Sequence, residues 1–181
     1  MSKKDTSDAI ALLTHDHKKI LALFDDFRRI KEDDDADDAK QALVERACME
    51  LSIHRQVEEE LFYPLLNDEL DDTKLLDQAA VEHEIAGQLI ADLESMQAGD
   101  DFYDAKFIVL GEYIRHHIEE EQEKIFPRAK KSTMDLKAIG EDILHRRDEL
   151  RTELGGPEVE ESHPAAREAG NNGSKRSGRH A

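Results

Sequence analysis

The stretch "HRQVEEELFYP", from His54 to Pro64, places a histidine and three consecutive carboxylates inside a segment whose spacing predicts a buried helical stripe. A second stretch, "HIEEEQEKIFP" from His117 to Pro127, repeats the same offsets from histidine to glutamate and from histidine to proline. Because charged groups are costly to bury, their presence at buried positions needs a chemical reason. The proline that ends each stretch predicts a helix end or a kink. The two stretches are interpreted as one structural solution used twice.

The composition indicates a single domain with a narrow core. A chain of 181 residues suffices for one ordinary domain and a tail, and charged residues make up 38% of it. The formal net charge of -18 makes nucleic acid and anionic membrane surfaces unfavourable partners. One cysteine, Cys48, cannot form an internal disulfide and is expected to be a small packing residue. No segment resembles a membrane span or a signal peptide, so a cytoplasmic location is expected.

Apolar residues recur at helical spacing in five blocks, and no alternating strand pattern is found. The predicted fold is therefore all-α, an antiparallel up-down four-helix bundle with a shorter fifth helix. The predicted helices cover about 10–27, 39–66, 73–97, 101–126 and 134–154. The bundle domain is expected to span 1–154, with its core at 8–130. Residues 155–181 contain no Leu, Ile, Phe or Tyr, and a disordered tail is predicted there.

Helical phase sorts the nine histidines, because positions three, four and seven apart share one face. Four histidines fall in the middle of an apolar stripe, one on each long helix: His17, His54, His83 and His117. Two of these stripes also carry a glutamate four residues after the histidine, namely Glu58 and Glu121. The other five are predicted to lie off the stripes, on the fifth helix or in the tail: His15, His116, His145, His163 and His180.

Some neighbours of these residues are assigned simpler roles. Glu59 and Glu60 are rotated away from the stripe and are predicted to be solvated charges. For Tyr63 and Tyr113 two interpretations stay open, simple packing and contact with the inward-facing groups.

An acid also directly precedes the inward-facing histidine on two helices, in the pairs Asp16-His17 and Glu82-His83. Glu82 and Glu84 flank the stripe around His83. Together with the two repeated stretches, this pattern indicates a duplicated helical hairpin.

Burying four imidazoles and two carboxylates together costs several kcal/mol for each uncompensated charge, and a bound cation removes that cost. Imidazole with carboxylate suits iron, manganese or zinc, and carboxylates that can bridge favour a two-metal site. With bridging glutamates and an oxo or hydroxo bridge, roughly two of about twelve octahedral positions stay open for a small molecule. The alternative is a metal-free bundle whose core histidines are satisfied by hydrogen bonds.

The chain resembles the hemerythrin-like (HHE cation-binding) family of non-heme di-iron helical bundles over about residues 8 to 130. The resemblance rests on four motifs in order, "HDHKKI", "HRQVEEELFYP", "EHEIAGQL" and "HIEEEQEKIFP". It implies a four-helix bundle, two iron ions joined by carboxylates and an oxo or hydroxo bridge, and binding of O2 or related small ligands. The iron ligands that it implies are His17, His54, Glu58, His83, His117 and Glu121.

The sequence departs from the oxygen-carrying members at two places. Those members carry two histidines four apart in the third helix, whereas Ala79 and Gly87 lie four residues on either side of His83. They also place an aspartate five residues after the last histidine, where this chain has Gln122, so Glu121 must serve instead. The chain is thus more similar to members with four histidines and two glutamates, which are linked to redox, peroxide, nitric oxide or iron handling.

The resemblance implies a di-iron protein that binds O2, NO or peroxide in an oxidative or nitrosative stress response. Peroxide breakdown of a peroxidase or catalase kind is one form of that activity. One alternative is an iron donor or repair protein for damaged iron centres, and another is a binding module in which the iron only senses. The sequence leaves open the electron donor, the oligomeric state and whether the protein is an enzyme.

Overall fold

The computed structural model describes residues 8–33 and 35–155, so all of the predicted tail except Gly155 lies outside the described residues. Within these residues the regular secondary structure is helical and no strand occurs, which confirms the all-α class. The segments are α1 (Ala9–Ile30), α2 (Asp37–Val57), η1 (Glu58–Phe62), α3 (Tyr63–Glu69), α4 (Lys74–Glu94), α5 (Tyr103–Glu120), η2 (Glu121–Ile125), α6 (Phe126–Ala129) and α7 (Leu136–Glu153).

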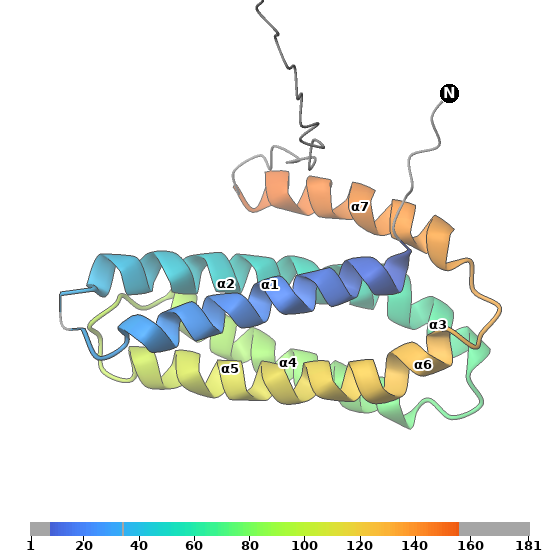
Figure 1. The fold of residues 1–181 in the computed structure, drawn as a ribbon, viewed down its shortest axis with the longest axis horizontal. Helices are drawn as coiled ribbons and strands as arrows, with labels where there is room; N and C mark the ends of the chain where they lie inside the picture. Colours follow the sequence, from blue (N-terminus) through green and yellow to red (C-terminus); the bar gives the residue numbers. More distant parts are fainter. Residues whose placement is uncertain (1–7, 34, 156–181) are drawn as a thin grey trace, which may run out of the picture.

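The helices α1, α2, α4 and α5 form the bundle, and consecutive long helices run antiparallel (Figure 1). α1 packs against α2 and α5, and α4 packs against the same two helices, so the four close around one interior. α7 lies along the outside of the bundle and packs against α1, α2 and η1 (Figure 1). This arrangement is the predicted four-helix bundle with a fifth helix at its side.

A polar layer divides the interior of the bundle into two hydrophobic clusters. In α1, Leu13 belongs to one cluster and Ile20 to the other, and His17 lies between them. α4 repeats this order, with Ala79 in the first cluster and Ala86 in the second. The inward-facing polar residues therefore cross the middle of the bundle, with apolar packing on either side that excludes water from them.

Helical spacing predicts that Leu65, seven residues after Glu58, and Ala80, three residues before His83, lie on the buried stripes, but both are exposed. Leu65 is 45% exposed and Leu66 is buried in its place. The cause is the π-helical turn η1, whose extra residue rotates everything that follows it. Ala80 is also exposed, because the stripe of α4 reaches His83 from Ala79, four residues earlier.

Both helices that carry an inward-facing glutamate become π-helical at that glutamate. The Tyr63 N–H bonds to the carbonyl of Glu58, and the Phe126 N–H bonds to the carbonyl of Glu121, each five residues back. A proline follows directly in both cases. Because proline lacks an N–H and its ring clashes with the carbonyl four residues earlier, the wider register accommodates it. The helix therefore changes register before the proline and continues as α3 or α6, rather than ending there.

The single cysteine lies in the apolar interior. Cys48 is 1% exposed and belongs to the cluster around Phe24 and Phe107. Burial, aided by the negative charge of Glu94, raises the pKa of its thiol to about 12. The thiol stays protonated at neutral pH, as expected for a packing residue.

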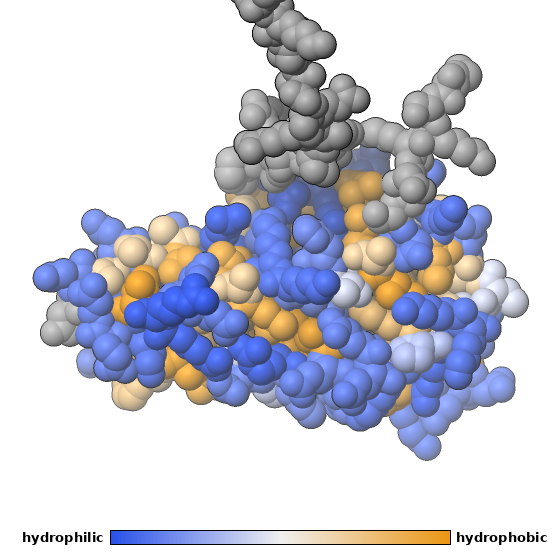
Figure 2. All heavy atoms as spheres, viewed as in Figure 1, coloured by the Kyte–Doolittle hydropathy of each residue, from blue (hydrophilic) through white to orange (hydrophobic). Residues whose placement is uncertain are grey.

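The surface of the bundle is mostly polar. Hydrophilic residues cover most of the face shown in Figure 2, and hydrophobic residues show through between them. This agrees with the formal net charge of -18. Among the helices that the structure describes, none combines the length and apolar character needed to cross a membrane.

Candidate metal centre

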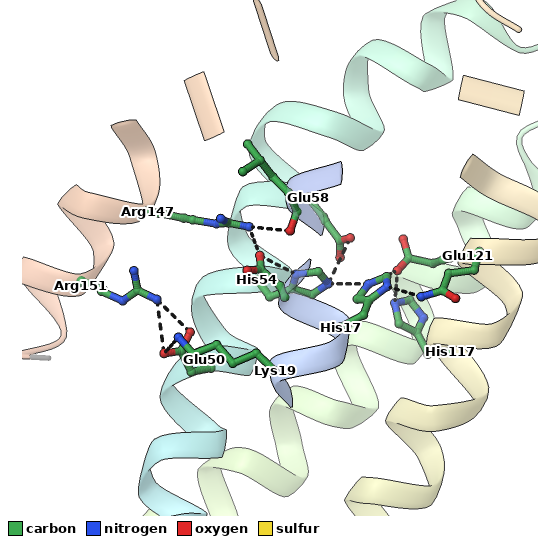
Figure 3. Close-up of polar contacts among 12 residues, drawn as sticks. His17, Lys19, Glu50, His54, Glu58, His117, Glu121, Arg147 and Arg151 are labelled. Carbon is green, nitrogen blue, oxygen red and sulfur yellow. Dashed lines mark hydrogen bonds and ion pairs between the residues drawn. The ribbon is translucent and has the colours of Figure 1, made fainter. Parts of the chain in front are cut away.

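The six predicted ligands lie together in the polar layer, and each is at most 5% exposed. Figure 3 shows five of them, contributed by α1, α2, η1, α5 and η2, and the sixth, His83, comes from α4. Their donor atoms form two groups in which all members lie within 4.8 Å of one another. One group contains His17, His54, Glu58 and Glu121, and the other contains Glu58, His83 and His117.

Two pairs of imidazoles face each other through their Nε2 atoms. Nε2 of His17 lies 3.0 Å from Nε2 of His54, and Nε2 of His83 lies 3.1 Å from Nε2 of His117. Two nitrogen ligands at right angles, each about 2.1 Å from a metal ion, are about 3.0 Å apart. Each pair therefore has the separation of adjacent ligands on one cation.

Glu58 lies between the two imidazole pairs. Its Oε1 is 3.2 Å from Nε2 of His54, and its Oε2 is 3.5 Å from Nε2 of His83. The side chain is fully buried, yet neither oxygen accepts a hydrogen bond within residues 8–33 and 35–155. Burying a carboxylate without partners costs several kcal/mol. A cation on either side would supply the missing partners, so the donor set fits a pair of metal ions.

Glu121 offers one oxygen to both imidazole pairs. Its Oε2 is 3.0 Å from Nε2 of His17 and 3.5 Å from Nε2 of His117, while Oε1 accepts a 2.6 Å hydrogen bond from the hydroxyl of Tyr63. Burial acts to raise the pKa of Glu121, but the close contact of its Oε2 with His17 and the charges of the neighbouring imidazoles outweigh burial and hold the pKa well below its usual value. Burial and the charges of Glu121 and Glu58 raise the pKa of Tyr63, so its hydroxyl remains a donor. Tyr63 thus contacts a candidate ligand and does more than pack.

The Nδ1 atom of each candidate histidine meets a polar side chain from another helical segment. The four pairs and the distances between their atoms are Asp16 Oδ2 to His54 at 3.4 Å, Glu59 Oε1 to His83 at 3.1 Å, Glu82 Oε2 to His117 at 2.7 Å and Gln122 Nε2 to His17 at 3.1 Å. The amide of Gln122 can accept through its oxygen after a half-turn. Such partners fix the tautomer that leaves Nε2 free for a metal, and they are typical of metal-binding histidines.

Two of these outer partners were assigned other roles on sequence grounds. The prediction that Glu59 is simply a solvated charge is wrong, because this half-exposed side chain contacts His83. Glu82, predicted only to flank the stripe, is 8% exposed, and its bond to His117 lowers the pKa of its carboxyl. Glu82 directly precedes His83 in the sequence, as Asp16 precedes His17, and this repeated pattern could have identified Glu82. Each such acid serves the histidine of the next helix, not its own neighbour.

The duplicated hairpin that the motifs predict appears in these contacts. α1 supplies an acid to the histidine of α2, and α4 supplies an acid to the histidine of α5. The aromatic residues that directly follow the two π-helical turns, Tyr63 and Phe126, make equivalent contacts. Phe126 stacks on His17 and Tyr63 stacks on His83, with ring centroids 5.6 and 5.5 Å apart. The tyrosine hydroxyl is one chemical difference between the two halves.

Apart from Glu59 and Glu82, the residues predicted to lie outside the site do so wherever the structure describes them. Three histidines are exposed: His15, His116 and His145. Two others, His163 and His180, lie outside the described residues. Glu60 pairs with Arg146 of α7 at the surface. Tyr113 is half-buried, and burial together with the nearby charge of Glu82 raises the pKa of its hydroxyl.

A small cavity of about 20 Å³ lies against the centre. Its wall includes three of the candidate histidines, Arg55 and six aliphatic side chains such as Ile20. A cavity of about 10–15 Å³ on this measure is enough for one water molecule. The space therefore has room for one molecule about the size of water.

Comparison with known proteins agrees with the helical-bundle fold and with a cation-binding domain. The hemerythrin HHE cation binding domain matches residues 8–129. A hemerythrin HHE cation binding domain-containing protein from Mycobacterium kansasii has a similar crystal structure, with a TM-score of 0.67 and 25% sequence identity over 81% of this chain and 89% of that one. No curated protein matches the sequence. The chain belongs to the hemerythrin HHE cation-binding domain family.

Proposed function

We propose that the chain binds two metal ions, expected to be iron, through His17, His54, Glu58, His83, His117 and Glu121. One observation supports this proposal most strongly. Two pairs of imidazoles, each with its two Nε2 atoms close together, lie on either side of the unpartnered carboxylate of Glu58. Membership of a cation-binding family supports the presence of metal. Imidazole and carboxylate donors suit iron, and the resemblance to di-iron members favours iron over manganese or zinc.

The donor atoms divide between the two ions. One ion would be held by the nitrogens of His17 and His54, and the other by those of His83 and His117. Glu58 serves both, since each of its oxygens faces a different imidazole pair. Seven protein donor atoms, counting both oxygens of Glu58 and one of Glu121, leave further positions on two octahedral ions for a small molecule.

The proposed ligand is a small redox-active molecule, O2 or NO in the first place. Iron supplies an open position and electrons for such a ligand when it is bound. The aliphatic wall and the volume of about 20 Å³ suit a diatomic molecule that needs no hydrogen bonds. A role in the response to oxidative or nitrosative stress follows from a site that captures these molecules.

Peroxide is the second candidate, and Arg55 is the observation that favours it. Its Nε is buried without an acceptor in the described part of the chain, and the residue lines the same cavity. Its guanidinium lies 3.5 Å from Glu59, which keeps it beside the centre. A donor at the cavity wall favours a ligand that accepts a hydrogen bond, and peroxide does so. Turnover of peroxide would be a peroxidase-like or catalase-like activity.

Metal analysis of the full-length protein tests the metal site. Protein reconstituted with Fe²⁺ without oxygen is expected to hold close to two irons per chain, and His54→Ala and Glu121→Ala are expected to lose most of them. His15→Ala, on an exposed histidine, serves as the matched control and should retain the metal. Unchanged iron content in both ligand variants would show that the assignment is wrong.

Absorption spectra recorded before and after adding O2, NO or peroxide then separate the ligands. If the centre acts on peroxide, Arg55→Met should slow peroxide loss while leaving NO binding unchanged. Equal effects on both reactions would instead assign Arg55 a structural role. Iron transfer to a metal-free acceptor protein, with no reaction toward the three ligands, would favour the alternative of an iron donor.

A further inference from the structure

Asp16 and Glu82, the two buried acids that contact candidate histidine ligands, have different second partners. Glu82 accepts a 2.9 Å hydrogen bond from Gln78, which lies four residues earlier on the same helix. Asp16 instead forms an ion pair with Arg147, which projects from α7 (Figure 3). The fifth helix thus reaches one half of the centre through a buried charge, whereas the other half is supported from within the four-helix bundle.

Arg147 differs from the other arginines that link α7 to the bundle, Arg146 and Arg151. It is 8% exposed, and its Nη2 contacts both Asp16 and the backbone oxygen of Leu12, the latter at 3.4 Å. One turn later Arg151 forms a 2.9 Å ion pair with Glu50 of α2 (Figure 3). Both arginines link α7 to the bundle, but Arg147 also touches an acid that contacts a candidate ligand.

The carboxylate of Asp16 borders an open space into which it can rotate. A hollow of about 990 Å³ lies between α7 and the helices α1 and α2, and Asp16 and Arg147 both line it. Within residues 8–33 and 35–155, the side chain of Asp16 has two polar partners, Arg147 and His54. Without the guanidinium, the carboxylate can rotate into the hollow and exchange its 3.4 Å contact with His54 for water.

We propose that Arg147 is a positioning residue of the metal centre, through which the docked helix α7 keeps Asp16 on His54 and completes the half of the centre built by His17 and His54. The inference rests on the proposed metal site. Because coupling between two binding events is reciprocal, metal bound at this half also stabilises the docking of α7. The centre is therefore sensitive to anything that moves the fifth helix.

The direction of the effect follows from the order of the charges. A guanidinium alone would repel a cation, but the carboxylate of Asp16 lies between Arg147 and His54 and offsets that repulsion. What Arg147 contributes is the position of an acceptor for Nδ1 of His54. Loss of such an acceptor from a metal ligand typically weakens metal affinity by about 10-fold to 100-fold.

Metal titration of the full-length protein tests the proposal. Wild type, Arg147→Met and Arg151→Met are titrated with Co²⁺, whose visible absorption reports its ligands, in competition with a chelator. We expect Arg147→Met to bind one of two ions at least about 10-fold more weakly, with Arg151→Met within about twofold of wild type and Arg147→Lys in between. Equal behaviour of the two Met variants, or tighter binding by Arg147→Met, overturns the proposal. A wild type that takes up no Co²⁺ would instead refute the metal site itself.

Hydrogen exchange along α7 gives a second readout that a purely structural arginine would not change. Metal is expected to slow exchange in α7 of wild type and Arg151→Met, and to leave it unchanged in Arg147→Met. If metal does not change the rate of hydrogen exchange in α7 of wild type, the proposed coupling between α7 and the metal centre is refuted. If Arg147→Met loses its helical signal, the same comparison is made with Asp16→Asn, which keeps the side-chain shape and should also uncouple α7 from metal.

Discussion

Replacing Glu58 by glutamine separates protein stability from metal binding. Glu58 is 0% exposed, and neither oxygen accepts a hydrogen bond within the described residues. Glutamine keeps the shape of the side chain and removes the charge, so the metal-free variant no longer buries a carboxylate without partners. Leaving a buried polar group unsatisfied costs about 1–3 kcal/mol, and more if the group is charged, so we expect metal-free Glu58→Gln to be more stable than wild type by at least about 1 kcal/mol.

With bound metal, wild type is expected to become more stable than Glu58→Gln. A ligand that binds only the folded state adds about 2.7 kcal/mol of stability at a free concentration 100-fold above its Kd. In a chain of this size 1 kcal/mol shifts the Tm by roughly 2–4 °C, so one bound ion should raise the Tm of wild type by roughly 5–11 °C. Glu58→Gln should gain little, because a neutral amide is a poor bridge between two cations.

Thermal unfolding followed by circular dichroism, with chelator and with excess Zn²⁺, measures both effects without redox chemistry. Glu123→Gln is the matched control, since Glu123 is an exposed glutamate of the other π-helical turn. The control should show the wild-type gain with metal. If Glu58→Gln keeps the full gain, Glu58 does not hold the metal and the reasoning is refuted.

Three further changes test other parts of the account. Tyr63→Phe removes a 2.6 Å hydrogen bond to Glu121, so urea unfolding of the metal-free protein should show a loss of about 1.5–3 kcal/mol, and no loss would mean that the hydroxyl only packs. Phe102→Gly should add about 1 kcal/mol to the free energy of unfolding, because Phe102 has a φ of 71° and is 76% exposed, whereas Phe102→Ala should add nothing. In the metal-free protein, burial acts to lower the pKa of His117, but its bond to Glu82 together with the charges of Glu121 and Glu58 outweighs burial and raises the pKa above 6.5. The protonated form therefore adds stability at low pH, and this stability is lost as the pH rises through the raised pKa of His117. The metal-free Tm should fall as the pH rises above 6.5, and a rise would contradict the assignment.

Helical phase was sufficient to find the bundle and the inward-facing groups. His17 lies four residues after the buried Leu13 and Glu58 lies seven residues after the buried Leu51, and a regular helix carries that phase into the interior without tertiary information. The same rule failed after Glu58, where Leu65 is exposed and Leu66 is buried. A proline predicts that a helix is disturbed, but not that the disturbance takes the form of one π-helical turn.

The outer contacts of the centre could not be read from local spacing. Asp16 and Arg147 are more than a hundred residues apart, and their ion pair depends on where α7 docks. Glu59 points away from its own helical stripe but toward His83 of α4, so phase on one helix gave the wrong environment for it. A recurring acid beside a histidine carried part of this information, and only the packing of neighbouring helices showed which histidine each acid serves.

The most direct test of the metal centre is a crystal structure of iron-loaded full-length protein with anomalous scattering measured at the iron absorption edge. Two anomalous peaks are predicted in the polar layer, one beside His17 and His54 and one beside His83 and His117, with an oxygen of Glu58 bonded to each. No peak in that layer, or iron held instead by the more exposed group of Glu82, His116 and Glu120, would contradict the account.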